Sequence, residues 1–289
     1  MIRRPVLNPF TQKAASPSQR GLLPCLNDYE SFHGEFNRIL TSFDSISLDK
    51  IGGDALQDRK DMKYLLPASQ VLTWIADLRT AYYAFKHCGD FIQPYRTLYF
   101  DSAHYKFYFD HHNGVAERYK IRAREYVLSQ ASYLEIKHKT GNGRTIKHRY
   151  KTKQLETTPA AFPHDFLEEN FPYPHLRLEP SLWSRFQRVT FVNKADHERV
   201  TLDFGLEFYA ADVYIPLTGF VIAEVKQNRS TRETKFARQL KSLLVRPTSF
   251  SKYCVGIALT HPAVKQNNFK PILKQIQELS MGGQHGIIH

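Results

Sequence analysis

Polar and apolar residues alternate along several segments of the chain, which is the pattern of half-buried strands. The segment 119–126, YKIRAREY, places Lys120, Arg122 and Arg124 at every second position. The same alternation recurs in further segments: 59–66, 133–140, 198–204 and 221–228. In a strand, alternate side chains point to opposite faces, so each segment predicts one charged face and one apolar face.

Other segments show helical spacing or a strong turn signal. Apolar residues three and four apart predict helices at 27–46, 67–85, 158–171, 231–245 and 262–279, and Pro271 is expected to interrupt the last of them. Further strands are expected at 95–101, 143–153, 182–194 and 252–260. The turn TGNG at 140–143 predicts a hairpin.

The order of these elements favours hairpins over a regular strand–helix alternation. We therefore expect an α+β fold, an antiparallel β-barrel tunnel of about eight strands with helices packed outside. Residues 1–26 lack periodicity and are interpreted as a flexible N-terminal arm. Residues 27–289 are expected to form a single domain whose motifs lie within 59–260.

Composition adds an anionic partner to this picture. The formal net charge is +12, and residues 116–153 hold eleven Lys and Arg against three acids. The three cysteines, Cys25, Cys88 and Cys254, form no CxxC pair, and the N-terminus has no secretory signal pattern. This cysteine usage fits a reducing cytoplasm, where we expect the protein. No apolar run reaches the roughly 20 residues of a membrane helix, so we expect no membrane span.

The direction of the charged faces decides between two interpretations. Any single strand of this kind is more often the wet face of an antiparallel sheet. Here the polar faces are rich in Arg and Lys, and the apolar faces need the helices as cover. That arrangement turns the cations inward, where only a polyanion and water would make them tolerable. We interpret the interior as a tunnel for phosphates.

The motifs resemble the VTC domain, the polyphosphate polymerase module within the triphosphate tunnel metalloenzyme superfamily. The resemblance covers about residues 59–260 and rests on their order: RKDMKYLLP, YRTLYFDS, YKIRAREY, YLEIKHKT, RVTFVNKADHERVTLD, VIAEVKQN and SFSKYCVGIAL. It implies transfer of the terminal phosphoryl of ATP to a polyphosphate chain. The superfamily's ExExK signature is absent, and Arg59, Asp61 and Lys63 stand at that strand.

The resemblance also implies residue roles. The catalytic set would be Lys63, Arg122, Arg124, Lys137, Arg199 and Lys226. Further phosphate contacts would come from Lys120, Lys139, Arg185, Ser251 and Lys252. Glu224 would hold the divalent metal, Mn²⁺ or Mg²⁺. Inorganic phosphate or sulfate would fit the same tunnel. Arg185 and Arg188 are three apart and cannot share a face of a regular strand, and we favour Arg185 as the inward one.

Two other functions stay open on the sequence. The same tunnel could hydrolyse tripolyphosphate or nucleoside triphosphates, or it could bind polyanions without catalysis, although we do not expect nucleic acid as the partner. Asp203 and Glu207 are equally suited to pair with a cation or to bind metal. The pair His111-His112 is expected in an exposed loop rather than at a metal, and Cys254 in a buried strand.

Overall fold

The computed structural model describes residues 23–51, 59–196, 198–210, 212–228 and 234–281, and all statements below concern these residues. Its helices are α1 (Leu23–Leu40), α2 (Ala68–Trp74), α3 (Lys106–His112), α4 (His164–Asn170), α5 (Lys235–Ser242), α6 (Lys252–Thr260) and α7 (Lys270–Met281). Its strands are β1 (Ser45–Ile46), β2 (Arg59–Pro67), β3 (Tyr82–Phe85), β4 (Gln93–Asp101), β5 (Arg118–Tyr126), β6 (Ala131–Lys139), β7 (Thr145–Thr152), β8 (Glu179–Asn193), β9 (Arg199–Ala210), β10 (Val213–Leu217) and β11 (Phe220–Asn228).

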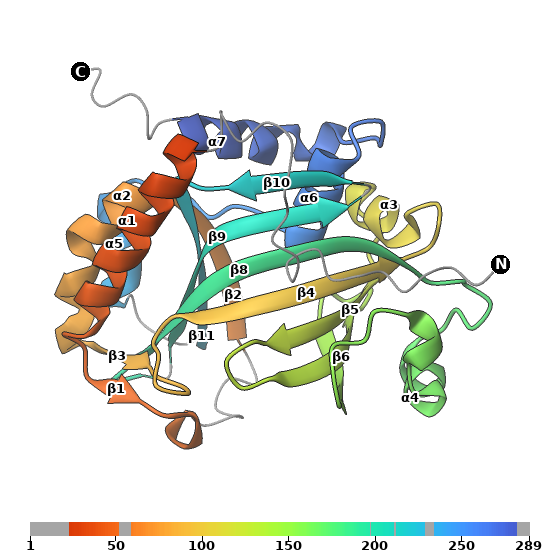
Figure 1. Cartoon of the computed structure of the whole chain (residues 1–289), viewed down its shortest axis with the longest axis horizontal. Coiled ribbons are helices and arrows are strands. Elements are labelled where there is room, and N and C mark those ends of the chain that lie inside the picture. The colour runs from red at the N-terminus through yellow and green to blue at the C-terminus, as the bar shows by residue number, and fades with distance from the viewer. Residues whose placement is uncertain (1–22, 52–58, 197, 211, 229–233, 282–289) are drawn as a thin grey trace.

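The strands form one large antiparallel sheet, which confirms the predicted α+β class. The main path runs β2-β11-β9-β8-β4-β5-β6-β7, with β1, β3 and β10 attached at its sides. Figure 1 shows α1, α2 and α5 together beside this sheet, and α6 and α7 along another side. Helices α1, α2 and α5 thus cover the apolar face of β2, β8, β9 and β11, as the alternating pattern required.

The sheet curls but does not close on itself within the described residues. No hydrogen-bonded pairing joins β7 to β2 in that part of the chain. The free edge of β2 is taken by the segment after α5, whose Thr248 N–H donates to the carbonyl of Lys63 over 2.7 Å. Covering that edge satisfies backbone groups that a closing strand would otherwise pair.

The prediction of a strand at 252–260 is wrong, because this segment forms α6. Ser251 caps the helix by accepting a hydrogen bond from the backbone N–H of Cys254. All but one of the residues from Tyr253 to Thr260 are buried. A short run that is apolar on every side has no periodicity to separate helix from strand.

Other elements differ from the prediction in smaller ways. Pro271 lies in the first turn of α7 and does not interrupt the helix, because a proline there needs no N–H partner. The segment 67–85 divides into α2, a 3₁₀ segment and β3, and β10 was not predicted. Most of the predicted N-terminal arm lies outside the described residues, and α1 begins at Leu23 rather than after residue 26.

Helix α6 packs directly onto β8 and β9. A Cβ added to Gly256 would meet Leu182 and come within 2.8 Å of a Phe208 ring carbon. We expect Gly256→Ala to lower the free energy of unfolding by about 1–3 kcal/mol, because the buried side chains of Leu182 and Phe208 must shift to admit the methyl group. Urea unfolding measures this. In the matched variant Gly34→Ala, on the exposed side of α1 with no atom within 4 Å of the new Cβ, we expect a gain of about 0.5–1 kcal/mol.

Candidate functional site

Strands β5, β6 and β7 carry charged side chains on one face. Antiparallel pairing sets Arg122 opposite Glu135 and Lys120 opposite Lys137. The next pair of strands sets Glu135 opposite Arg149 and Lys137 opposite Lys147. By this alternation, the charged face consists of Lys120, Arg122, Arg124, Glu135, Lys137, Lys139, Lys147 and Arg149.

Glu135 collects three of these cations around one buried carboxylate. Its side chain is 1% exposed, and its oxygens accept from Arg122 at 2.6 Å, Lys147 at 2.5 Å and Arg149 at 2.8 Å. Burial disfavours the charged form of Glu135, but the charges of Arg122, Arg124 and Lys147 outweigh it and hold the pKa well below the usual range. The carboxylate therefore fixes the positions of three cations from three strands.

The opposite wall is built by β2, β11 and β9. Lys63 stands opposite Glu224 in the β2–β11 register, and Glu224 stands opposite Thr201 of β9. Lys226 donates to Glu224 over 3.0 Å. Burial opposes the charge on Glu224, yet Lys226, Lys63 and Arg188 hold its pKa well below the usual range.

The two walls face each other across the curled sheet. Lys63 of β2 and Lys120 of β5 donate to adjacent residues, Phe250 and Ser251, although β2 and β5 lie far apart in the strand order. The charges of Lys63 and Glu224 also act on the pKa of Lys137 of β6. Water reaches Lys137 even though protein surrounds its ammonium group. The cations of both walls thus share one space that water can enter. We call the charged residues of the first wall, together with Lys63, Glu224 and Lys226 of the opposite wall, the basic cluster. This is the inward orientation that the alternation predicted.

A buried ion triad lies between the walls. Arg188 of β8 donates two hydrogen bonds to Asp203 at 2.6 and 2.7 Å, and Lys252 of α6 donates to the same carboxylate. Asp203 is 2% exposed, and its two partners hold its pKa well below the usual range against the effect of burial. Asp203 is therefore paired with cations, one of the two roles that the sequence left open.

The structure places Arg188, and not Arg185, in the basic cluster. Arg185 pairs with Glu207 at 2.7 Å and interacts with Tyr29 of α1, so both residues lie on the helix-covered face. The register between β8 and β9 shifts between Arg185 and Gln187, so that Glu207 lies on the opposite face of β9 from Asp203. Glu207 therefore cannot join a metal site with Glu224.

The N-terminus of α6 reaches into the basic cluster. Lys120 donates to the Ser251 hydroxyl over 2.9 Å, and Lys63 donates to the carbonyl of Phe250 over 3.0 Å. Tyr253, the second residue of the helix, donates to the buried Asp101, which anchors α6 to β4. Ser251 and Lys252 thus lie beside the strand cations, as expected.

Two further predicted residues lie at the ends of the charged strands. Arg199 stands opposite Lys226 in the β9–β11 register. Lys139 stands opposite Arg118 at the far end of β6. Arg124, the third cation of β5, donates to Thr97 over 3.3 Å and lies over the Tyr95 ring.

The donors around Glu224 suit a divalent ion that arrives with its own phosphate and water ligands. Thr201, directly opposite Glu224, has a buried hydroxyl oxygen with no hydrogen-bond partner in the described residues. The nearby Asp203 is already paired with two cations. A single carboxylate with a hydroxyl is typical of magnesium sites that are completed by substrate phosphates and water.

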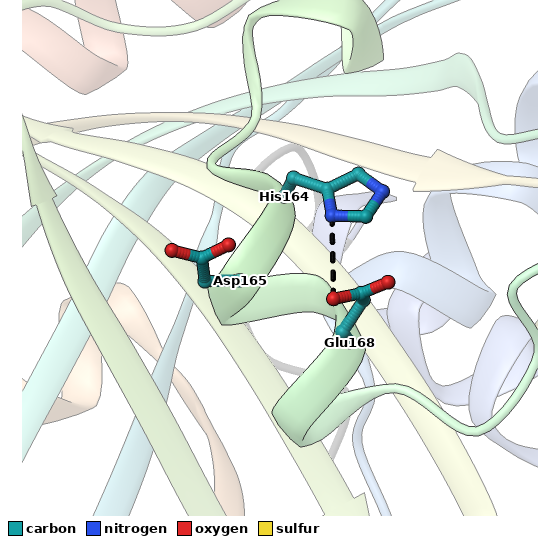
Figure 2. Close-up of side chains that lie close together, drawn as sticks. All are labelled: His164, Asp165 and Glu168. Carbon is teal, nitrogen blue, oxygen red and sulfur yellow. Dashed lines mark ion pairs between the residues drawn. The ribbon is translucent and has the colours of Figure 1, made fainter.

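Other potential metal ligands gather on the exposed surface. His164, Asp165 and Glu168 of α4 lie close together, and His164 Nδ1 lies 3.3 Å from a Glu168 oxygen (Figure 2). All are exposed and on a helix of seven residues, and none belongs to the basic cluster. The pair His111-His112 ends α3, with His112 buried and bonded to Asn268, so the predicted exposed loop is wrong.

Lysines of the basic cluster titrate near neutral pH. Burial and the charges of neighbouring cations lower the pKa of Lys137 to about 7 and of Lys120 to about 8. Burial also lowers the pKa of Lys147 to about 7 and of Lys252 to about 8, although Glu135 and Asp203 oppose this. These four lysines therefore lose their positive charge at a pH close to neutral, well below the pH at which an exposed lysine does.

We expect anion binding to weaken as pH rises from 6.5 to 9. A bound anion favours the protonated lysines, so their deprotonation removes attraction, with an expected loss in affinity of about tenfold or more. Calorimetry with sulfate, which keeps its charge over this range, measures the effect and the accompanying proton uptake. Lys137→Met should flatten the pH profile, and an affinity independent of pH in the unmodified protein would contradict the prediction.

Residues 58–261 match the VTC domain family. The chain belongs to the VTC domain family. None of the curated proteins matches it. The match covers the strands of the basic cluster and α6, so the VTC domain supplies the whole site.

Solved structures give a weaker likeness. One neighbour is a proposed adenylate cyclase from Bacillus halodurans, with 13% identity, a TM-score of 0.45, and coverage of 68% of this chain and 95% of that chain. Another is a proposed adenylyl cyclase from Hippeastrum with a dominant triphosphatase activity, with 15% identity, a TM-score of 0.42, and coverage of 68% and 94%. At these TM-scores the likeness supports no conclusion about the function of this chain.

Proposed function

We propose that this VTC domain is a metal-dependent phosphotransferase that moves the terminal phosphoryl of ATP to a polyphosphate chain. The observation that carries the proposal is the basic cluster around Glu224, whose neighbour Thr201 on β9 has a hydroxyl oxygen without a hydrogen-bond partner among the described residues. Cations far outnumber carboxylates there, so the site is built for a ligand with several negative charges.

The reaction needs alignment and charge neutralisation more than covalent help. An oxygen of the acceptor's terminal phosphate attacks the γ-phosphorus, the bond to the β-phosphate oxygen breaks, and ADP leaves with that electron pair. Arg122, Arg124, Lys137, Lys63, Arg199 and Lys226 would hold the phosphates and neutralise the charge that spreads over them. Lys120, Lys139, Ser251 and Lys252 would bind neighbouring phosphates, and the geometry favours Arg188 over Arg185 for the same task.

Glu224 and the Thr201 hydroxyl would hold Mn²⁺ or Mg²⁺. When bound, the ion supplies Lewis-acid polarisation of the transferring phosphoryl group. Because Lys63, Lys226 and Arg188 surround Glu224, a free cation is repelled, and the ion is expected to enter together with the triphosphate.

A cytoplasmic location fits an ATP donor and the free thiols of Cys88 and Cys254. No helix in the described part of the chain is both long and apolar enough to cross a membrane.

The products of incubation with ATP and Mn²⁺ test this proposal. Polyacrylamide gels should show polyphosphate ladders that lengthen with time, and ADP should accumulate in equal amount to the phosphate incorporated. Orthophosphate without ladders would replace the transferase by a hydrolase of the same site. Tight binding of polyphosphate with no turnover under any divalent metal would leave a binding module.

A further inference from the structure

Three tyrosines form a row on the same face as the basic cluster. Tyr95 of β4 stands opposite Tyr126 of β5, with ring centroids 4.9 Å apart. Tyr133 of β6 continues the row, 5.8 Å from Tyr126 in an edge-to-face arrangement. Strand alternation sets Tyr126 on the face of Arg124 and Tyr133 on the face of Glu135. We call Tyr95, Tyr126 and Tyr133 the tyrosine row.

Arg149 of β7 covers the outer end of this row. Its guanidinium lies 4.6 Å from the centroid of the Tyr133 ring and donates to the Tyr126 hydroxyl over 3.0 Å. The Arg149 side chain is 39% exposed, and Tyr126 and Tyr133 are only partly buried, whereas Tyr95 is buried. The row thus runs from the interior to a guanidinium plane that solvent can reach.

The row borders both the phosphate-binding cations and an open hollow. Arg149 and Arg122 hold the same carboxylate, that of Glu135, so the outer end of the row adjoins the basic cluster. On its other side, Tyr133 stands opposite Lys151 and Tyr126 opposite Ala131. Residues 129–131 and 151–153 line a hollow of about 380 Å³ there.

We propose that Tyr126, Tyr133 and Arg149 form a stacking platform for the nucleobase of the nucleotide whose phosphates lie on the basic cluster. The inference rests on the proposed function, because it names where the donor's base lies. Bases stack on aromatic rings and on arginine guanidinium planes through their π faces. The platform offers such planes at the rim, next to cations suited to the triphosphate.

The platform predicts a particular selectivity. Stacking depends on the area of the ring system and tolerates any base, so purine nucleotides are expected to bind more tightly than pyrimidine nucleotides. It also predicts that the base adds to the affinity of ATP, so that ATP binds more tightly than its triphosphate group alone would bind. A purely structural role for the tyrosines, as supports for Arg124 and Arg149, would change both ligands equally.

Calorimetry with ATP and with tripolyphosphate, in EDTA so that no transfer occurs, tests the platform. We expect Tyr133→Leu, which keeps an apolar side chain but loses the aromatic face, to weaken ATP binding about tenfold. Tripolyphosphate binding should change less than twofold. The matched control is Tyr150→Leu on the outer face of the neighbouring strand, where Tyr150 is 44% exposed and contacts Phe166. This variant should bind both ligands as the unmodified protein does.

Each outcome decides the inference. Selective loss of ATP affinity, together with loss of the purine preference over CTP, supports the platform. Equal weakening of ATP and tripolyphosphate, or no change in either, overturns it while leaving the triphosphate site in place. Failure of the unmodified protein to bind tripolyphosphate overturns the proposed function, and the platform with it.

Discussion

Replacing Glu224 with glutamine is expected to abolish turnover while tripolyphosphate still binds. The amide keeps the shape of the side chain but loses the charge that would hold the metal beside Thr201. We expect kcat to fall by about a hundredfold to a thousandfold, which corresponds to a few kcal/mol of lost stabilisation in the transition state. Initial rates with ATP and Mn²⁺, followed as ADP release, measure this.

Binding without metal separates this role from simple disruption of the site. Glu224 repels an anion, so its removal should leave metal-free tripolyphosphate affinity unchanged or slightly higher. Glu207→Gln is the matched control, because Glu207 pairs with Arg185 on the helix-covered face and its loss should not affect turnover. Turnover that survives Glu224→Gln would show that the metal assignment is wrong.

Asp203→Asn is expected to lower the free energy of unfolding by about 3 kcal/mol. Asp203 is 2% exposed and is the shared counter-ion of Arg188 and Lys252, so the amide leaves two buried cations without a carboxylate. Urea unfolding measures the loss. Tripolyphosphate should stabilise this variant more than it stabilises the unmodified protein, since the ligand supplies the missing negative charge.

An exposed ion pair is the appropriate comparison. Asp44 pairs with Lys194 at 2.6 Å, and its side chain is 71% exposed. Asp44→Asn should therefore cost less than about 1 kcal/mol. Equal losses in the two variants would contradict the view that Asp203 is a buried counter-ion of the basic cluster.

Strand alternation predicted most of the wall residues because side-chain direction in a strand follows directly from position. Lys120, Arg122 and Lys137 lie on the face that the sequence assigned to them. Alternation correctly set Arg185 and Arg188 on opposite faces of β8, but it did not say which one faces inward, and the choice of Arg185 was wrong. The register shift lies on β9, where it turns Glu207 away from the face of Asp203. Gly205, which has a positive φ of 56° at this shift, is the one sequence signal that could have indicated it.

The counter-ions were the part of the site that the sequence did not assign. Glu135 is one acid among cations in the sequence, and its position alone does not indicate that Arg122, Lys147 and Arg149 all bind its carboxylate. Arg149 and Lys147 belong to an edge strand, where basic residues usually face only water. Their approach to Glu135 follows from the register of the β6–β7 hairpin, which sets Arg149 directly opposite Glu135 and Lys147 opposite Lys137.

The sequence by itself determined most of the strands, the helix-covered face and the basic character of the other face. These follow from local physics, since alternation and helical spacing act within a few residues. Only the tertiary structure decided that Lys63 and Lys137 face each other. It also decided that the edge of β2 pairs with the segment at residue 248 rather than with β7, and that α6 enters the basic cluster as a helix. Those outcomes depend on the curvature of the sheet and on contacts between segments far apart in the chain, whose energies no single segment contains.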